Sequence, residues 1–280
     1  MIKEETVNNI KITPVKVPII EKTEIKGAQL FDIFPYNLFI ASKKKSGKTS
    51  LISNIIQKTT DKDTIFYLFV STHAIDPSWK TIIETLDKRG CEVNVYDSIS
   101  EGKHNYLDEV INKLNNDDDN QKIKGKGKQT PTILPQSSMK IYRGGGPVEV
   151  IEEEPEKKKK KKTPKYLFIF DDISNQLKNT AVSRFLKIHR HFGASCIISS
   201  QYVKDLQPQA ITQIDYFITF KNFSEEKLMH IWKLLDLSID FEKYLQLYHY
   251  ATKEPFSFLY TNVRTEEFRK SFSTVLKISE

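Results

Sequence analysis

Residues 37–57 constrain the fold more than any other part of the chain. Residues 37–41, Asn-Leu-Phe-Ile-Ala, form an apolar run typical of a buried strand. Residues 42–49, Ser-Lys-Lys-Lys-Ser-Gly-Lys-Thr, match the phosphate-loop pattern G-x-x-x-x-G-K-[ST], except that Ser42 replaces the first glycine. Apolar residues then recur at three- and four-residue spacing, which predicts an amphipathic helix over residues 48–57. Strand, loop and helix in this order predict a site for a nucleoside triphosphate.

Each residue of the loop has a predicted contact with the ligand. The backbone N–H groups of residues 44–49 and the helix N-terminus would face the phosphates, and Lys48 would reach the β- and γ-oxygens. The Thr49 hydroxyl would bind Mg²⁺. The alternative is a lysine-rich surface turn ahead of a helix. The expected nucleotide-binding residues are Lys44, Lys45, Ser46, Gly47, Lys48, Thr49 and Ser50.

A second apolar run, residues 166–170, ends in the paired carboxylates Asp171 and Asp172. Wholly apolar runs of this length are typical of central parallel strands, whose carboxyl ends meet at the ligand edge of a sheet. We expect Asp171 to hold Mg²⁺, through water, and Asp172 to orient or deprotonate the attacking water. Taken alone, the run would be better explained as a buried strand that ends in an acidic turn, and the phosphate loop upstream is what favours the metal site.

A third strand, predicted over residues 193–201, ends at Gln201. If it neighbours the Asp171 strand, Gln201 would lie beside the γ-phosphate and could respond to its loss. Strands alternating with helices predict an α/β fold with a largely parallel central sheet flanked by helices. The other expected strands are residues 64–70, 91–96, 216–220 and 256–260, and the other expected helices are residues 78–89, 180–191 and 224–235.

The composition is that of a globular protein, because 280 residues with 39% hydrophobic side chains can bury a sizeable core. The net charge of +7 favours a polyanionic partner. Cys91 and Cys196 lie in apolar runs, which argues for core residues in a reducing compartment and against a disulfide scaffold. No run approaches the roughly 18 apolar residues of a membrane span, and no apolar core follows the charged N-terminus, so we expect neither a span nor a signal peptide.

Low-complexity sequence interrupts the pattern between residues 115 and 164. Acidic, Gly/Lys-rich and Gly-rich pieces precede a glutamate cluster and the lysine run of residues 157–162. Because such a segment buries too little apolar surface to offset its ordering entropy, we expect a disordered insertion, with a small hairpin near residues 132–142. The lysine run is either a solvated linker or a patch for DNA or a nuclear address. The expected organisation is an arm (1–28), two parts of one domain (29–114 and 165–280) and the insertion between them.

Several classes of nucleotide-binding protein can be tested against the sequence. A GTPase needs Asn/Thr-Lys-x-Asp, and the nearest match, residues 112–115, has asparagine in the last position, which disfavours this class. A small-molecule kinase needs an arginine-rich lid, for which the insertion offers only Arg143. A multimeric ATPase needs an arginine from the neighbouring subunit. Arg190 is the first candidate for that arginine and Arg184 the second.

Four segments, residues 42–49, 168–172, 190–193 and 198–201, resemble the poxvirus-type genome-packaging ATPases of the FtsK/HerA superfamily, found in nucleocytoplasmic large DNA viruses and virophages. The resemblance covers residues 31–237 apart from the insertion. It implies a RecA-like P-loop ATPase that forms a homo-oligomeric ring and drives double-stranded DNA, without sequence preference, into a preformed viral capsid.

The resemblance also implies cofactors, a location and roles for individual residues. ATP and Mg²⁺ would be the cofactors, and the protein would act in viral factories of the host cytoplasm and associate with the virion. A small-molecule kinase and a non-catalytic nucleotide-binding component stay open as alternatives. By position, Lys48 and Thr49 would bind phosphate and Mg²⁺, Asp171 and Asp172 would be the metal-binding and water-activating acids, and Gln201 would be the phosphate sensor.

Overall fold

The computed structural model describes residues 24–124 and 162–277. Most of the expected arm and most of the insertion lie outside the described residues, and so do the expected hairpin near residues 132–142 and all but the last lysine of the run. The described end of the arm meets the far end of the insertion, because Ile25 forms an isolated parallel bridge with Lys162.

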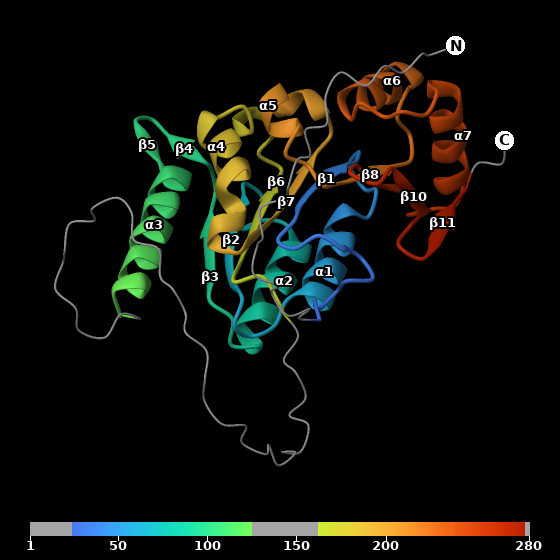
Figure 1. Ribbon diagram of the computed structural model, residues 1–280. Helices are drawn as coiled ribbons and strands as arrows, with labels where there is room; N and C mark the ends of the chain where they lie inside the picture. Colours follow the sequence, from blue (N-terminus) through green and yellow to red (C-terminus); the bar gives the residue numbers. More distant parts are fainter. Residues whose placement is uncertain (1–23, 125–161, 278–280) are drawn as a thin grey trace, which may run out of the picture.

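A nine-stranded sheet forms the centre of the molecule, in the order β11-β10-β9-β8-β1-β7-β6-β2-β3 (Figure 1). The strands from β8 to β3 in this order are parallel, and β9, β10 and β11 add antiparallel strands at one side. The expected α/β fold with a mostly parallel sheet is therefore confirmed. The strands are β1 Asn37–Ala41, β2 Ile65–Val70, β3 Val93–Tyr96, β6 Tyr166–Asp171, β7 Ala194–Ser200, β8 Tyr216–Phe220, β9 Phe258–Asn262, β10 Glu267–Lys270 and β11 Thr274–Leu276, beside a small ribbon of β4 Ser100–Glu101 and β5 His104–Asn105.

Helices cover both faces of this sheet, which is why the central strands are apolar throughout rather than alternating. One hydrophobic cluster joins the sheet to α1 and α2, and a second joins its other face to the remaining α-helices. Cys91 and Cys196 are free thiols buried in this core, as the sequence predicts. The helices are α1 Lys48–Thr59, α2 Pro77–Lys88, α3 Tyr106–Lys124, α4 Thr180–Ile188, α5 Pro208–Ile211, α6 Glu225–Leu234 and α7 Phe241–Ala251, with 3-10 helices η1 Ser174–Gln176, η2 His189–Phe192 and η3 Val203–Asp205.

The structure differs from the sequence-based expectation in three places. Helix α3 runs through residue 115, where the insertion was expected to begin, and its first half anchors Leu107, Val110 and Leu114 in the core. The strand expected over residues 256–260 begins at Phe258, because Phe256 lies in a turn with φ 61°. Helices α3, α5 and α7, strands β10 and β11 and the β4–β5 ribbon have no counterpart among the expected elements.

Three strand ends converge at the carboxyl edge of the sheet. Strand β7 lies between β1 and β6, with Ala41 opposite Ser200 and Asp171 opposite Ser199. The expectation that the Gln201 strand neighbours the Asp171 strand is therefore confirmed. Because parallel strands end at the same edge, the loop after β1, the carboxylates after β6 and Gln201 share one region.

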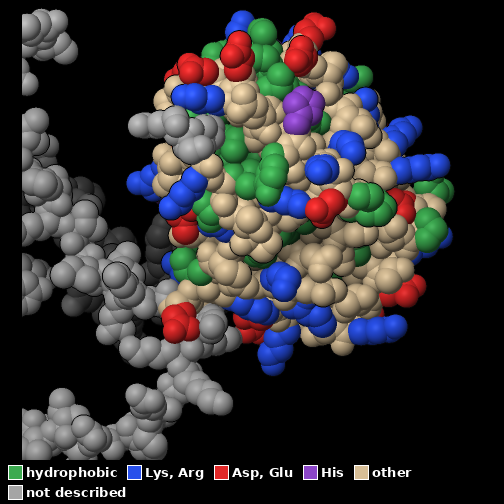
Figure 2. Space-filling model, turned by 90° about the vertical axis from the view of Figure 1, so that its right-hand side faces the viewer, with side chains coloured by type: hydrophobic (Ala, Val, Ile, Leu, Met, Phe, Trp, Pro, Cys, Tyr) green, Lys and Arg blue, Asp and Glu red, His purple; other side chains and the backbone are tan. Residues whose placement is uncertain are grey.

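In the described ranges, no helix is both long and apolar enough to cross a membrane. Lysine and arginine side chains are spread over the face that carries α7 and β11, with hydrophobic and acidic side chains among them (Figure 2).

Candidate nucleotide-binding site

The loop between β1 and α1 has the backbone that a phosphate cradle needs. Gly47 caps helix α1 with φ 91°, a left-handed conformation that favours glycine, and Lys45 also has a positive φ of 61°. Ser42, which replaces the usual first glycine, is buried and continues the strand, because its N–H donates to the Ser200 carbonyl oxygen at 3.1 Å. Serine is tolerated here because Ser42 does not have the positive φ that would favour glycine.

The Lys48 ammonium group joins the loop to the end of β6. Its Nζ lies 2.7 Å from Asp171 Oδ1 and 2.5 Å from Asp172 Oδ1. Burial is the largest single influence on the pKa of Lys48 and lowers it, but the two carboxylates together raise the pKa by more, so the group is held protonated. An ammonium group has three N–H donors, so one remains for a phosphate oxygen.

Asp171 is completely buried and has a partner that the sequence pattern did not indicate. The Trp79 indole Nε1–H, from α2, donates to Asp171 Oδ2 at 3.0 Å. Burial raises the pKa of Asp171, while Lys48 opposes that shift. A fully buried tryptophan on the helix after β2 therefore fixes one carboxylate oxygen and leaves the other to face Lys48.

Asp172 is presented differently from its neighbour. Its backbone is left-handed, with φ 55°, and its side chain is 38% exposed. The turn after β2 holds it, because Ser71 Oγ donates to the Asp172 carbonyl oxygen at 2.7 Å and Thr72 Oγ1 to Oδ2 at 3.4 Å. Because of this left-handed backbone at Asp172, the two consecutive carboxylates have different environments: Asp171 is buried and Asp172 is exposed.

These groups surround a pocket of about 820 Å³, within the range of roughly 300–1,000 Å³ that is common for ligand sites. Asp171 is not part of its wall and meets the site through Lys48. All seven nucleotide-binding residues expected from the sequence line the pocket, together with Asp172 and Gln201. The further lining residues are Thr72, Asp76, Ser78, Ser174, Asn175 and Phe256.

The residues present fit a Mg²⁺-bound triphosphate. Ser46 Oγ is buried in the loop without a hydrogen-bond partner in the described structure, so a donor hydroxyl is available at the phosphate cradle. The hydroxyl of Thr49 and the carboxylate of Asp172 face the same pocket, and both offer the oxygen ligands that Mg²⁺ prefers. Asp171 Oδ1 would be the further oxygen, behind Lys48.

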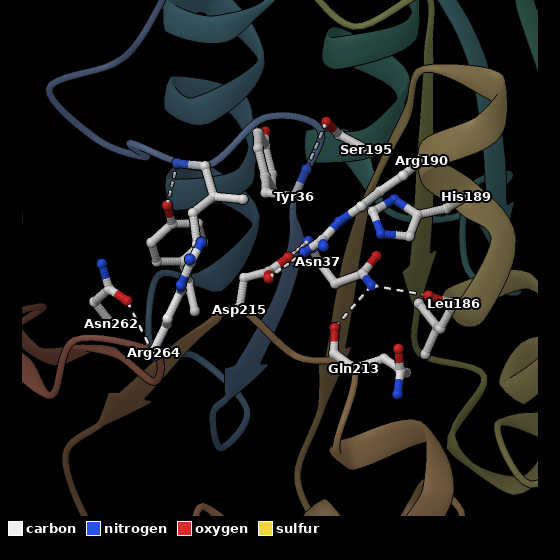
Figure 3. Close-up of polar contacts among 12 residues, drawn as sticks. Tyr36, Asn37, Leu186, His189, Arg190, Ser195, Gln213, Asp215, Asn262 and Arg264 are labelled. Atoms are coloured by element: carbon white, nitrogen blue, oxygen red, sulfur yellow. Dashed lines mark hydrogen bonds and ion pairs between the residues drawn. The ribbon is translucent and has the colours of Figure 1, made fainter. Parts of the chain in front are cut away.

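The arginines proposed to act from a neighbouring subunit lie away from this pocket. Arg190, in η2, lies at the amino edge of the sheet, where its Nη2 is 2.6 Å from Asp215 Oδ1 (Figure 3). Its side chain is nevertheless 56% exposed. Arg184, on α4, pairs with Asp108 of α3 at 2.5 Å and is 54% exposed. Both side chains are accessible at the surface, and neither contributes to the pocket of its own chain.

A parallel sheet whose first strand runs through a Gly-Lys-Thr loop into a helix, with acidic residues at a nearby strand end, defines a P-loop nucleotide-binding protein. Residues 147–251 match the family described as Poxvirus A32 protein, which confirms the resemblance over that part of the chain. The matched stretch contains Asp171, Asp172, Arg190 and Gln201, and the phosphate loop lies before it.

Solved structures that match this chain at low sequence identity include viral and bacterial proteins. The genome packaging NTPase B204 from Sulfolobus turreted icosahedral virus 2, in complex with ATP-gammaS, is 17% identical with a TM-score of 0.46, covering 85% of this chain and 97% of that chain. The complex of the same protein with sulfate is 16% identical with a TM-score of 0.48, covering 88% of this chain and 98% of that chain. The cytoplasmic domain of the Thermomonospora curvata Type VII secretion ATPase EccC is 13% identical with a TM-score of 0.39, covering 81% of this chain and 24% of that chain. Among curated proteins, no sequence matches the chain.

Proposed function

We propose that this protein hydrolyses ATP and uses the energy to move double-stranded DNA into a viral capsid. The observation that carries the hydrolytic part is the convergence of Lys48, Asp172 and Gln201 on one pocket behind a phosphate loop. The packaging part is supported by the match to the Poxvirus A32 protein family and by the resemblance of the four sequence segments.

In this proposal the chain's own residues position the triphosphate and the attacking water. Lys48 donates its remaining N–H to a phosphate oxygen, and its charge offsets the charge that develops on the transferred phosphoryl group. Asp172, exposed to the pocket and held by Thr72, accepts a proton or a hydrogen bond from the water. Mg²⁺, when bound near Thr49, would neutralise phosphate charge. Gln201, which lines the pocket, would change its hydrogen bonds when the γ-phosphate is lost and would pass that change to the end of β7.

The proposal includes assembly into a homo-oligomeric ring, because an arginine must come from a second subunit to complete the site. Arg190 remains the first candidate, since more than half of its side chain is exposed while Asp215 holds the guanidinium in one orientation. Arg184 is the second candidate and is held in the same manner by Asp108.

The DNA part of the proposal follows from charge rather than from a base-reading element. A net charge of +7 and the lysines spread over the surface suit contacts with phosphates, which carry no sequence information. We therefore expect DNA binding that is independent of sequence and weakens steeply as salt rises. The protein would act in host-cell viral factories beside the capsid that it fills.

The test is the rate of ATP hydrolysis by the purified protein with and without double-stranded DNA, measured alongside its mass in solution. The proposal predicts turnover without any added phosphoacceptor, stimulation by DNA of unrelated sequences and a mass of several chains. Turnover that requires a small-molecule phosphoacceptor would identify a kinase instead. ATP binding that survives with no turnover would identify a non-catalytic component.

A further inference from the structure

The nucleotide pocket contains one large apolar side chain among its lining residues, Phe256. Every other lining side chain is polar, charged or, at Gly47, absent. A triphosphate is satisfied by such polar groups, but a nucleobase has an apolar face that needs a flat partner. Binding of the phosphates therefore explains the other lining residues but not Phe256.

Phe256 reaches the phosphate loop from a distant part of the sequence. A Cβ atom placed on Gly47 would lie 3.1 Å from Phe256 Cδ1, so the aromatic ring covers that glycine directly. The loop that precedes β9 is thereby placed against the start of α1. Because β9 is antiparallel to β8, its beginning lies at the carboxyl edge, beside the phosphate loop rather than at the far end of the sheet.

The turn that carries Phe256 is held from both sides. The Ser257 N–H and Oγ both donate to the Glu254 carbonyl oxygen, at 3.4 and 2.7 Å, and Lys270 Nζ lies 2.6 Å from Glu254 Oε1. Lys221, just after β8, donates to the Lys253 carbonyl oxygen at 3.1 Å. The phenyl ring is thus presented by a fixed turn and not by a loose tail.

Burial in the core does not explain this presentation. Phe256 is 71% exposed, and its φ of 61° is a conformation that bulky residues rarely adopt. A bulky aromatic residue held at that φ with most of its surface open points to a ligand that covers the ring. Tyr202, another exposed aromatic residue, already has a partner, because Lys227 Nζ lies 4.1 Å from the centroid of its ring.

We propose that Phe256 is the base-stacking residue of the nucleotide site and that its ring packs on the face of the nucleobase while the phosphates lie on residues 44–49. The proposal rests on the proposed function, because it assigns the base end of the same ligand. Stacking recognises the π-face that all bases share, so Phe256 contributes affinity for ATP and GTP alike and does not choose between them.

The experiment compares Phe256→Ala with wild type in binding ATP, GTP and inorganic tripolyphosphate, which has the phosphates without a base. We expect ATP and GTP to bind about tenfold more weakly to the variant, and tripolyphosphate to bind as it does to wild type. Phe256→Trp should restore the affinity for ATP and GTP. Met229→Ala, which removes an exposed apolar side chain outside the pocket, is the control and should change none of the three.

Two results would overturn the stacking role. An equal loss for tripolyphosphate would mean that Phe256 only supports the phosphate loop, and unchanged ATP affinity would mean that the base lies elsewhere. Wild-type protein that binds neither ATP nor tripolyphosphate would instead remove the proposed function together with this inference. A circular-dichroism melt of each variant shows that the loss is not unfolding.

Discussion

Each edge of the sheet holds a carboxylate with little solvent exposure beside a basic side chain, Asp171 at one edge and Asp215 at the other. The two sites differ in what else surrounds them. At the carboxyl edge, Lys48 bridges Asp171 and Asp172, and both Lys48 and Asp172 line the nucleotide pocket. At the amino edge, Asp215 accepts from the Asn37 backbone N–H at 2.9 Å and pairs with Arg190, around a cavity of about 160 Å³ (Figure 3).

The comparison teaches that burial alone does not distinguish a reactive carboxylate from a structural one. Burial raises the pKa of Asp171 and of Asp215. At the amino edge a backbone N–H of β1 and the Arg190 guanidinium each bind one oxygen of Asp215, so this carboxylate ties β1 to the start of β8. At the carboxyl edge, the second acid Asp172 is exposed to the pocket, and Lys48 keeps a spare donor. We infer that the carboxyl edge carries out the chemistry and that the amino edge fixes the start of the strands.

The largest expected effect is on turnover, and it would show that the amino edge also takes part in the chemistry. If Arg190 acts on the nucleotide of a neighbouring subunit, Arg190→Ala should lower turnover of the assembled protein by on the order of a thousandfold or more. Arg184→Ala, which removes the second candidate and a similarly exposed arginine, is the comparison and should leave turnover near that of wild type. The reverse pattern would move the trans-acting role to Arg184. Two unchanged rates would leave the amino edge purely structural.

Asp172→Asn should lower turnover by about 10²–10⁴-fold while ATP still binds, because the amide keeps the shape but loses the basic oxygen. Single-turnover hydrolysis and equilibrium binding of ATP measure the two quantities separately. An unchanged rate would remove Asp172 from the chemistry and support a non-catalytic protein.

The amino edge should respond to pH through His189, whose Nδ1–H donates to the Ala194 carbonyl oxygen at 2.5 Å. Burial lowers the pKa of His189 from 6.5 to about 4. The unfolded chain therefore takes up the proton first as the pH falls. The contribution of neutral His189 to the free energy of unfolding is fully present above pH 6.5. It is lost progressively as the pH falls toward 4, by up to about 3 kcal/mol.

The measurement is the free energy of unfolding in denaturant between pH 4 and pH 7, for wild type and His189→Asn. The variant keeps a side-chain N–H donor but does not titrate, so its profile should be flatter. His249→Asn, at an exposed position, should follow wild type. Parallel profiles for wild type and His189→Asn would show that His189 is not buried as a neutral ring.

Asp215→Ala should cost about 1–3 kcal/mol of unfolding free energy, because it leaves the Asn37 N–H without its acceptor inside the protein. ATP affinity should stay within about twofold, since the change is at the opposite edge from the pocket. Asp97→Ala removes an exposed partner of His73 and should cost less than about 0.5 kcal/mol. A large loss of ATP affinity in Asp215→Ala would show that the two edges are coupled.

Much of the carboxyl edge could be predicted from the sequence because its signals are local. The strand, loop and helix of residues 37–59 are contiguous, and the apolar run before Asp171 identifies a central strand without any tertiary information. Even the position of Gln201 followed from a strand ending in polar residues, once β7 lay beside β6.

The parts that could not be predicted depend on contacts between distant segments. Trp79 looks like any core residue of an amphipathic helix, and only the fold brings its indole N–H to Asp171. Phe256 looked like the start of a strand, since its positive φ cannot be read from an aromatic residue after proline. Helix α7 did carry a signal, because Tyr244, Leu247, Tyr248 and Ala251 recur at helical spacing and are all buried.

The most direct test of the central claim is ATP hydrolysis by Lys48→Ala compared with wild type and with Lys43→Ala, an exposed lysine of the same loop outside the pocket. The account predicts that Lys48→Ala, with its fold verified by circular dichroism, loses at least about a hundredfold in turnover, whereas Lys43→Ala keeps the wild-type rate. A Lys48→Ala protein that hydrolyses ATP as fast as wild type would contradict the account.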